Sequence, residues 1–166
     1  MERPLEQRVS VLDRAPTESD AVPEPMLTAP MMQALDVSSV RLALTFDDCR
    51  IYVGLGTEPE SLFLCVVGPN GGGASSGPRA TLVTHGARVQ GGGGMTIGIV
   101  ADPVTAVRVG DVEAVLANNA FIANASMYEG IVVTTAEGER RVPRPPQPDP
   151  QRSTTRRLQG PFLPLV

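Results

Sequence analysis

Residues 95–142 carry the pattern that most narrows the fold of this chain. Short apolar and β-branched runs, from MTIGIV at 95–100 to IVVTT at 131–135, are separated by Gly, Asp and Asn. Runs of this length with such boundaries are typical of strands in an antiparallel sheet. The stretch therefore predicts a series of short strands, against which most of the remaining ordered chain packs.

The alternation of apolar with polar or small residues extends this prediction towards the N-terminus. It begins at Val40 and runs to Phe46, with the period of two that a half-buried strand has. Asp47-Asp48 indicates a tight turn, and strands at 49–53 and 61–68 complete a meander. We expect an all-β fold, a small antiparallel sandwich or open barrel of seven to nine strands.

Other segments predict something different from a strand. PMLTAPMMQALD at 25–36 favours one short N-terminal helix. PNGGGASSGP at 69–78 consists of residues that favour turns, so we expect a turn there. ATLVTHGARV at 80–89 fits either a short helix or a strand, and both remain open. QGGGG at 90–94 predicts a flexible link.

The two ends of the chain predict disordered tails. Residues 1–24 mix charges with Pro and have no hydrophobic period, and residues 143–166 are rich in Pro and Arg. Such composition leaves too little apolar surface to offset the entropy of ordering. We therefore expect a single β-rich domain over 25–142.

Composition and charge narrow the possible partners and compartment. The 14 basic and 18 acidic residues give a net charge of −4, and every basic residue is Arg. A mildly acidic chain without a basic patch is a poor candidate for nucleic acid. LFLCVV at 62–67 is far below the roughly 20 residues that span a bilayer. We expect a soluble, cytoplasmic protein with no membrane partner.

Three motifs in the second half occur in a fixed order: GIVADPVTAVRVGD at 98–111, NAFIA at 119–123 and IVVTTAEGER at 131–140. They resemble a group of small β-rich domains from high-GC Gram-positive bacteria, in which a G-L-V-P-D-G-V segment precedes an N-x-F segment and a terminal hairpin. Here ADPV at 101–104 replaces the P-D-G-V turn, and Ser75-Ser76 stand where many members have a second cysteine. The resemblance implies no known activity, and it adds an extracytoplasmic location as an alternative.

Several residues are candidates for catalysis or ligand binding. His85 is the single histidine, so a hydrolase would need it as general base, with Ser75 or Ser76 as nucleophile and Asp102 to orient it. However, we assign no nucleophile elbow, which is a sharp strand-to-helix turn that exposes a reactive serine.

The glycine-rich stretches and the turn aspartates support no binding site either. GGGG at 91–94 leads into a strand, and the chain lacks the Lys that a phosphate-binding P-loop needs. Asp47 and Asp48 could join Asp102 or Asp111 around a cation, although turn aspartates usually satisfy backbone N–H groups. We assign no catalytic, cofactor-binding or metal-binding residue.

The arginines near the C-terminus are the clearest charge asymmetry. They fit a solvated tail that needs no function, or a docking segment for an acidic protein partner. They are Arg140, Arg141, Arg144, Arg152, Arg156 and Arg157. The leading hypothesis is a non-enzymatic interaction or structural module. The alternatives are a small hydrolase that uses His85, and a small-ligand binder, which would need a deep apolar pocket.

Strand alternation also predicts the core and the position of the two cysteines. A hairpin that turns around Thr57 would place Cys49 opposite Cys65 on the core face, near disulfide range. The residues expected in the core are Ile97, Ile99, Val107, Val109, Val115, Phe121, Ile131 and Val133.

Overall fold

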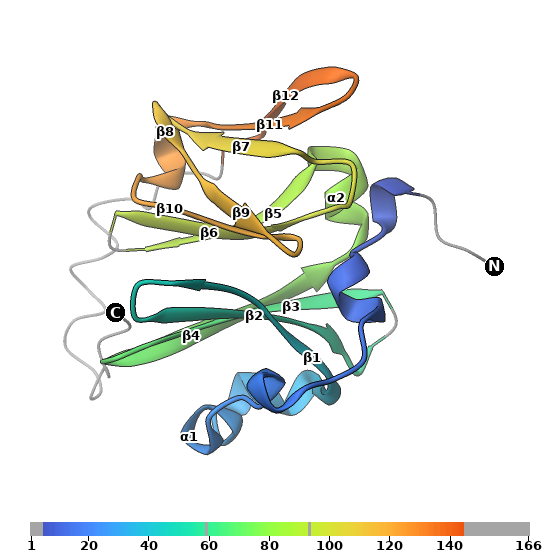
Figure 1. Cartoon of the computed structure of the whole chain (residues 1–166), viewed down its shortest axis with the longest axis vertical. Coiled ribbons are helices and arrows are strands. Elements are labelled where there is room, and N and C mark those ends of the chain that lie inside the picture. The colour runs from blue at the N-terminus through green and yellow to red at the C-terminus, as the bar shows by residue number, and fades with distance from the viewer. Residues whose placement is uncertain (1–4, 59, 93, 145–166) are drawn as a thin grey trace, which may run out of the picture.

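A computed structural model describes residues 5–58, 60–92 and 94–144. Within them the chain forms three four-stranded antiparallel sheets, which lie one above another as layers (Figure 1). The prediction of an all-β antiparallel fold is confirmed. The described residues form twelve strands, whereas the sequence predicted seven to nine. The hydrophobic pattern neither distinguished the shortest strands nor indicated a third sheet.

The first sheet, sheet A, is a meander with strand order β1-β2-β3-β4. Its strands are β1 (Leu35–Phe46), β2 (Cys49–Gly56), β3 (Ser61–Gly68) and β4 (Gly71–Pro78). β4 corrects the prediction of a turn over 69–78. Its Gly and Ser residues have little strand preference of their own, but the chain pairs residue by residue with the apolar β3.

Sheet B lies in the middle of the stack and has the order β5-β6-β10-β9. Its strands are β5 (Ala87–Gly92), β6 (Met95–Val100), β9 (Val115–Ala117) and β10 (Ala120–Ala123). Residues 80–89, for which the sequence left helix and strand open, form one of each. Helix α2 (Ala80–His85) ends at Gly86, which has a φ of 79°, and β5 follows. β5 also reaches into the glycine run that the sequence predicted as a flexible link.

Sheet C has the order β12-β11-β7-β8 and covers the far side of sheet B (Figure 1). Its strands are β7 (Ala106–Val109), β8 (Val112–Glu113), β11 (Ile131–Thr135) and β12 (Gly138–Val142). The short 3-10 helix η5 (Met127–Glu129) leads from sheet B into β11.

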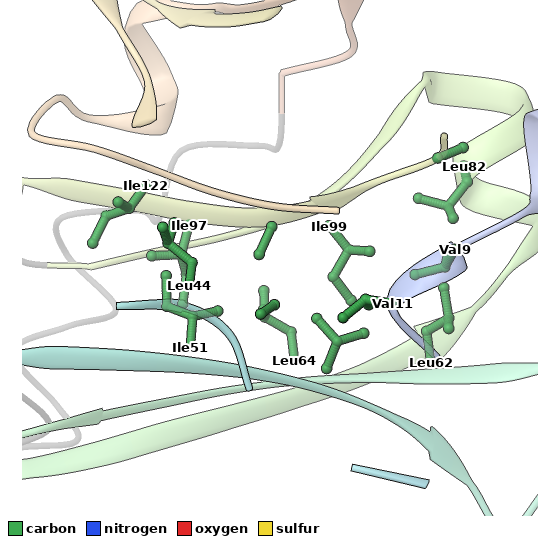
Figure 2. Packing of buried hydrophobic residues seen from close by; sticks show 14 residues of the cluster. Val9, Val11, Leu44, Ile51, Leu62, Leu64, Leu82, Ile97, Ile99 and Ile122 are labelled. Atoms are coloured by element: carbon green, nitrogen blue, oxygen red, sulfur yellow. The ribbon is translucent and has the colours of Figure 1, made fainter. Parts of the chain in front are cut away.

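Two hydrophobic cores fill the space between the layers, so both faces of sheet B are buried. Between sheets A and B lie Leu44, Ile51, Leu62, Leu64, Ile97, Ile99 and Ile122 among others (Figure 2). Between sheets B and C lie Val100, Phe121 and Ala123 of sheet B against Val107, Val109, Ile131 and Val133 of sheet C.

Seven of the eight predicted core residues are buried, and Val115 is the exception. It is 42% exposed because β9 is a three-residue strand at the edge of sheet B. Asn118 and Asn119, with φ values of 48° and 68°, join β9 to β10. Two positive φ values suit a tight hairpin turn.

The N-terminal segment is ordered from Leu5, so the prediction of a disordered tail over 1–24 is wrong for the described residues. The 3-10 helices η1 (Leu5–Gln7), η2 (Ser10–Asp13) and η3 (Glu18–Asp20) run along the layers. Val9 and Val11 enter the core between sheets A and B, where Figure 2 shows them beside Leu62. Both valine side chains are nearly fully buried.

The N-terminal segment continues across the outer face of sheet A. Helix α1 (Glu24–Leu27) and the 3-10 helix η4 (Pro30–Ala34) take the place of the single helix predicted over 25–36. Ala29 is extended, as expected of a residue before proline, and this separates the two turns. Val22 and Met32 pack there with Tyr52, Phe63 and Cys65.

Asp20 anchors this segment to β1 through a buried carboxylate. It accepts hydrogen bonds from Arg14 Nη2 at 2.6 Å, from the Leu42 backbone N–H at 2.7 Å and from the Thr17 backbone N–H at 2.6 Å. Burial by itself would raise the pKa of Asp20, but these donors outweigh it and hold the pKa well below its usual value.

Replacing Asp20 by Asn is expected to lower the free energy of unfolding by about 2 kcal/mol at neutral pH, because charged hydrogen bonds are lost. Since the folded pKa is lowered, the carboxylate stabilises the fold fully above about pH 4, and this contribution falls as the pH drops further. The difference from wild type should therefore narrow in acid. Urea titrations at several pH values measure it.

Asp13→Asn is the matched control for this prediction, because the Asp13 side chain is 63% exposed and pairs with Arg8 at the surface. It should change the stability by less than about 0.5 kcal/mol. An Asp20→Asn variant that is as stable as Asp13→Asn would show that the anchor contributes nothing.

The predicted pairing of the two cysteines is wrong. Phe46 does lie opposite Cys49, but in the next hairpin Cys65 lies opposite Tyr52. This register differs by three residues from a turn centred on Thr57, and an odd shift moves a side chain to the other face. Cys65 therefore packs under the N-terminal segment, while Cys49 is on the face of Ile51, and both thiols are free.

Candidate functional site

His85 does not form a catalytic arrangement with the predicted partners. It is half-buried at the last position of α2, and the described residues offer it no recorded hydrogen bond or ion pair. Ser75 lies on β4, where its hydroxyl oxygen is buried without a hydrogen-bond partner among the described residues. The geometry gives the hydrolase hypothesis no support.

Asp102, which the hydrolase hypothesis needs to orient His85, forms hydrogen bonds with other residues instead. Its Oδ1 accepts hydrogen bonds from the Ser10 backbone N–H at 2.9 Å and from Asn119 Nδ2 at 2.8 Å. The Asn119 side-chain oxygen in turn accepts from the Val11 N–H at 3.0 Å. Asp102 and Asn119 thus fasten the N-terminal segment to sheet B.

The remaining turn aspartates lie apart from one another. Asp47 and Asp48 are exposed in the β1–β2 turn of sheet A, and Asp111 is exposed in the β7–β8 turn of sheet C. Within the described part of the chain, no three His, Cys, Asp or Glu side chains gather as metal ligands would.

The described surface includes two hollows of similar volume. The first, of about 500 Å³, lies between α2, the 101–104 turn and the β11–β12 hairpin. Its lining is mostly apolar, with Glu137 and Arg140 as its charged residues. Arg140 also donates a hydrogen bond to the Val83 carbonyl at 3.1 Å, so it ties the hairpin to α2.

The second hollow, of about 490 Å³, is lined by three arginines, and we call it the arginine pocket. The pairing of sheet C creates it: Val132 in the centre of the sheet lies opposite Arg108 on one side and Arg141 on the other. All three residues occupy one row on the outer face, away from sheet B. Arg144, just beyond β12, completes the set.

Backbone and two acidic residues form the rest of the arginine pocket. Its lining includes Gly110 and Asp111 from the β7–β8 turn, and Glu129 and Gly130 before β11. The Gly110 N–H donates to the Gly130 carbonyl at 2.7 Å. Gly130 has a φ of 102°, and a Cβ built on it would lie 3.5 Å from an Arg144 guanidinium nitrogen, so the arginine lies over a bare backbone.

The charges of the arginine pocket are only partly compensated. Arg108 Nη1 lies 3.6 Å from Glu139 Oε1, in an exposed ion pair. No ion pair within 4 Å is recorded for Arg141 or Arg144 among the residues described. Guanidinium groups bind carboxylates in a planar, bidentate way, so the two free arginines are suited to an acidic ligand.

Sequence reasoning found part of this site. Arg141 and Arg144 belong to the basic C-terminal stretch that was predicted to dock a partner, whereas Arg152, Arg156 and Arg157 lie outside the described residues. Arg108 was not foreseen, because only the pairing of β7 with β11 brings it there. No local sequence signal would have found it.

Comparisons with known proteins identify no relative. No family model matches the chain, and neither a curated protein nor a solved structure does. The resemblance of the second half to the Gram-positive domains therefore stays a prediction. Among the described residues, no helix has the length and apolarity needed to cross a bilayer.

Proposed function

We propose that this protein is a non-enzymatic interaction module whose arginine pocket binds an acidic segment of a partner protein. The observation that carries the proposal is the position of Arg141 and Arg144 at one hollow of about 490 Å³, where neither has an ion-pair partner among the described residues. A partner that supplies carboxylates there would form charge-assisted hydrogen bonds, which are stronger than neutral ones.

The shape and charge of the surroundings favour a peptide over a nucleic acid. Asp111 and Glu129 line the same pocket as the arginines, and Glu139 is paired with Arg108. A phosphate backbone needs a continuous basic stripe, which these acids interrupt. A short acidic segment can place one or two carboxylates on the arginines and avoid the acids.

A direct binding assay tests this proposal with a fluorescein-labelled hexaglutamate peptide as probe. We expect saturable binding that weakens with added salt, and at least tenfold weaker binding by the double variant Arg141→Ala/Arg144→Ala, because tenfold corresponds to about 1.4 kcal/mol. Fluorescence anisotropy at low and at high salt measures both effects.

The matched control is Arg50→Ala, which removes an exposed arginine of β2, in a different layer. It should bind the peptide as wild type does. Equal affinity of the double variant and wild type would refute the proposal. So would a duplex DNA that binds more tightly than the peptide and competes for the same arginines.

A further inference from the structure

Strand β4 has one unpaired side along its whole length. It pairs with β3 in eight successive positions, from Gly68 opposite Gly71 to Ser61 opposite Pro78, without a register shift. It is the last strand of sheet A, and no other described strand pairs with it. Every second residue of β4 therefore directs its N–H and C=O groups outward.

Edge strands usually carry a feature that prevents further pairing, such as shortness, a bulge, a charge or a proline. The other edge strands of the described sheets follow the rule. β8 has two residues and β9 has three, β1 has register irregularities, β5 holds Arg88, and β12 holds Glu139, Arg140 and Arg141. β4 has eight residues, no charge, and a proline only at its end.

A half-buried cation lies next to this open edge. Arg88 of β5 pairs with Ile99, so its side chain lies on the face of sheet B that looks towards sheet A. Its guanidinium packs directly on Gly77 of β4, where a Cβ would come within 2.7 Å of Arg88 Cζ. A side chain at position 77 would displace the guanidinium from its present place.

The polar atoms around Arg88 lack partners. Arg88 Nε, Ser75 Oγ and Gln90 Oε1 are all buried without a hydrogen bond among the described residues. Ser75 and Gly77 share a face of β4, and Arg88 and Gln90 share a face of β5. Burial also lowers the pKa of Arg88, since its charge has lost water. A buried polar group without a partner destabilises the free protein, and a ligand with the complementary group removes this cost.

We propose that β4 binds an extended acidic segment of a partner protein, which adds a fifth strand to sheet A and places an Asp or Glu carboxylate on Arg88. A strand added to β4 would lie about 4.8 Å from it, so its inward side chains would stand beside Gly77. Main-chain hydrogen bonds along the edge supply affinity, and the unpaired guanidinium selects the acidic side chain. This site is separate from the arginine pocket, which is on the outer face of sheet C.

The test uses two acetylated heptapeptides, TVTETVT and TVTQTVT, which differ only in the central residue. Glu and both Val side chains share one face of the peptide strand, so the acid can face Arg88 with apolar neighbours. We expect the Glu peptide to bind at least tenfold more tightly than the Gln peptide in calorimetry. Amide hydrogen exchange should slow within residues 71–78 when the Glu peptide is added.

Arg88→Met should bring the affinity for the Glu peptide down to that for the Gln peptide. Arg141→Ala in the arginine pocket is the control and should leave both affinities unchanged, so this proposal and the proposed function fail independently. If Arg88→Met does not fold, the comparison of the two peptides on wild type still decides. Equal affinities for both peptides, affinity weaker than about 1 mM for each, or protection outside 71–78 would overturn the proposal.

Discussion

A variant that begins at Pro23 is expected to lose most of its stability, although the removed residues look like a tail in the sequence. It lacks Val9, Val11 and Val22, which are 2%, 5% and 8% exposed, together with the Asp20 anchor. Burying each valine contributes about 1.5 kcal/mol or more, so the loss is roughly 5 kcal/mol before the anchor is counted. Domains of this size are stable by only about 5–15 kcal/mol.

Urea unfolding followed by circular dichroism measures this effect. The control is removal of residues 145–166, which lie outside the described residues and for most of which the sequence predicts no tertiary contacts. That variant should remain within about 0.5 kcal/mol of the full chain. A Pro23 variant as stable as the full chain would mean that residues 5–22 do not hold the layers together.

Phe121→Ala is expected to cost about 3–5 kcal/mol, the usual range for a buried phenylalanine. Phe121 is fully buried in the core between sheets B and C. Its ring lies directly against the backbone of Gly98, the residue opposite it in β6, so no side chain there can move in to fill the space.

The same measurement on Val115→Ala supplies the comparison for this variant. Val115 is in the neighbouring strand of the same sheet and is 42% exposed, so its truncation should cost less than about 0.5 kcal/mol. If Phe121→Ala costs under about 1 kcal/mol, the two layers do not close around the ring as described.

The alternation of apolar and polar residues predicted a strand best where only one face of that strand is buried. The strands of sheet C follow this rule, and their core positions were predicted correctly. In β1 the register shifts between Leu42 and Leu44 and both faces are covered, so the alternation predicted from Val40 to Phe46 does not hold. β4 could not be predicted, because glycines and serines have no hydrophobic pattern and the strand exists through its pairing with β3. The N-terminal segment was missed for a related reason: its valines are isolated in sequence, and only contacts with distant residues bury them.

Register was the least predictable feature. The chain between β2 and β3 includes Thr57, whose N–H donates to the Ala34 carbonyl at 2.8 Å instead of closing a tight hairpin. The resulting three-residue shift separated the cysteines. The candidate sites have the same limitation: Arg108 reaches the arginine pocket, and Arg88 reaches Gly77, through strand pairing and layer packing that no local motif encodes.

The position of sheet B between two cores has a consequence for how the molecule can be divided. Sheet A is a complete meander that ends at Pro78, so one could try to express the chain as two pieces divided after this residue. The second piece, however, would expose Ile97, Ile99 and Ile122 to water, because sheet A is what covers them. The chain should therefore unfold in one step, and the amides of β6 and β10 should exchange with solvent last.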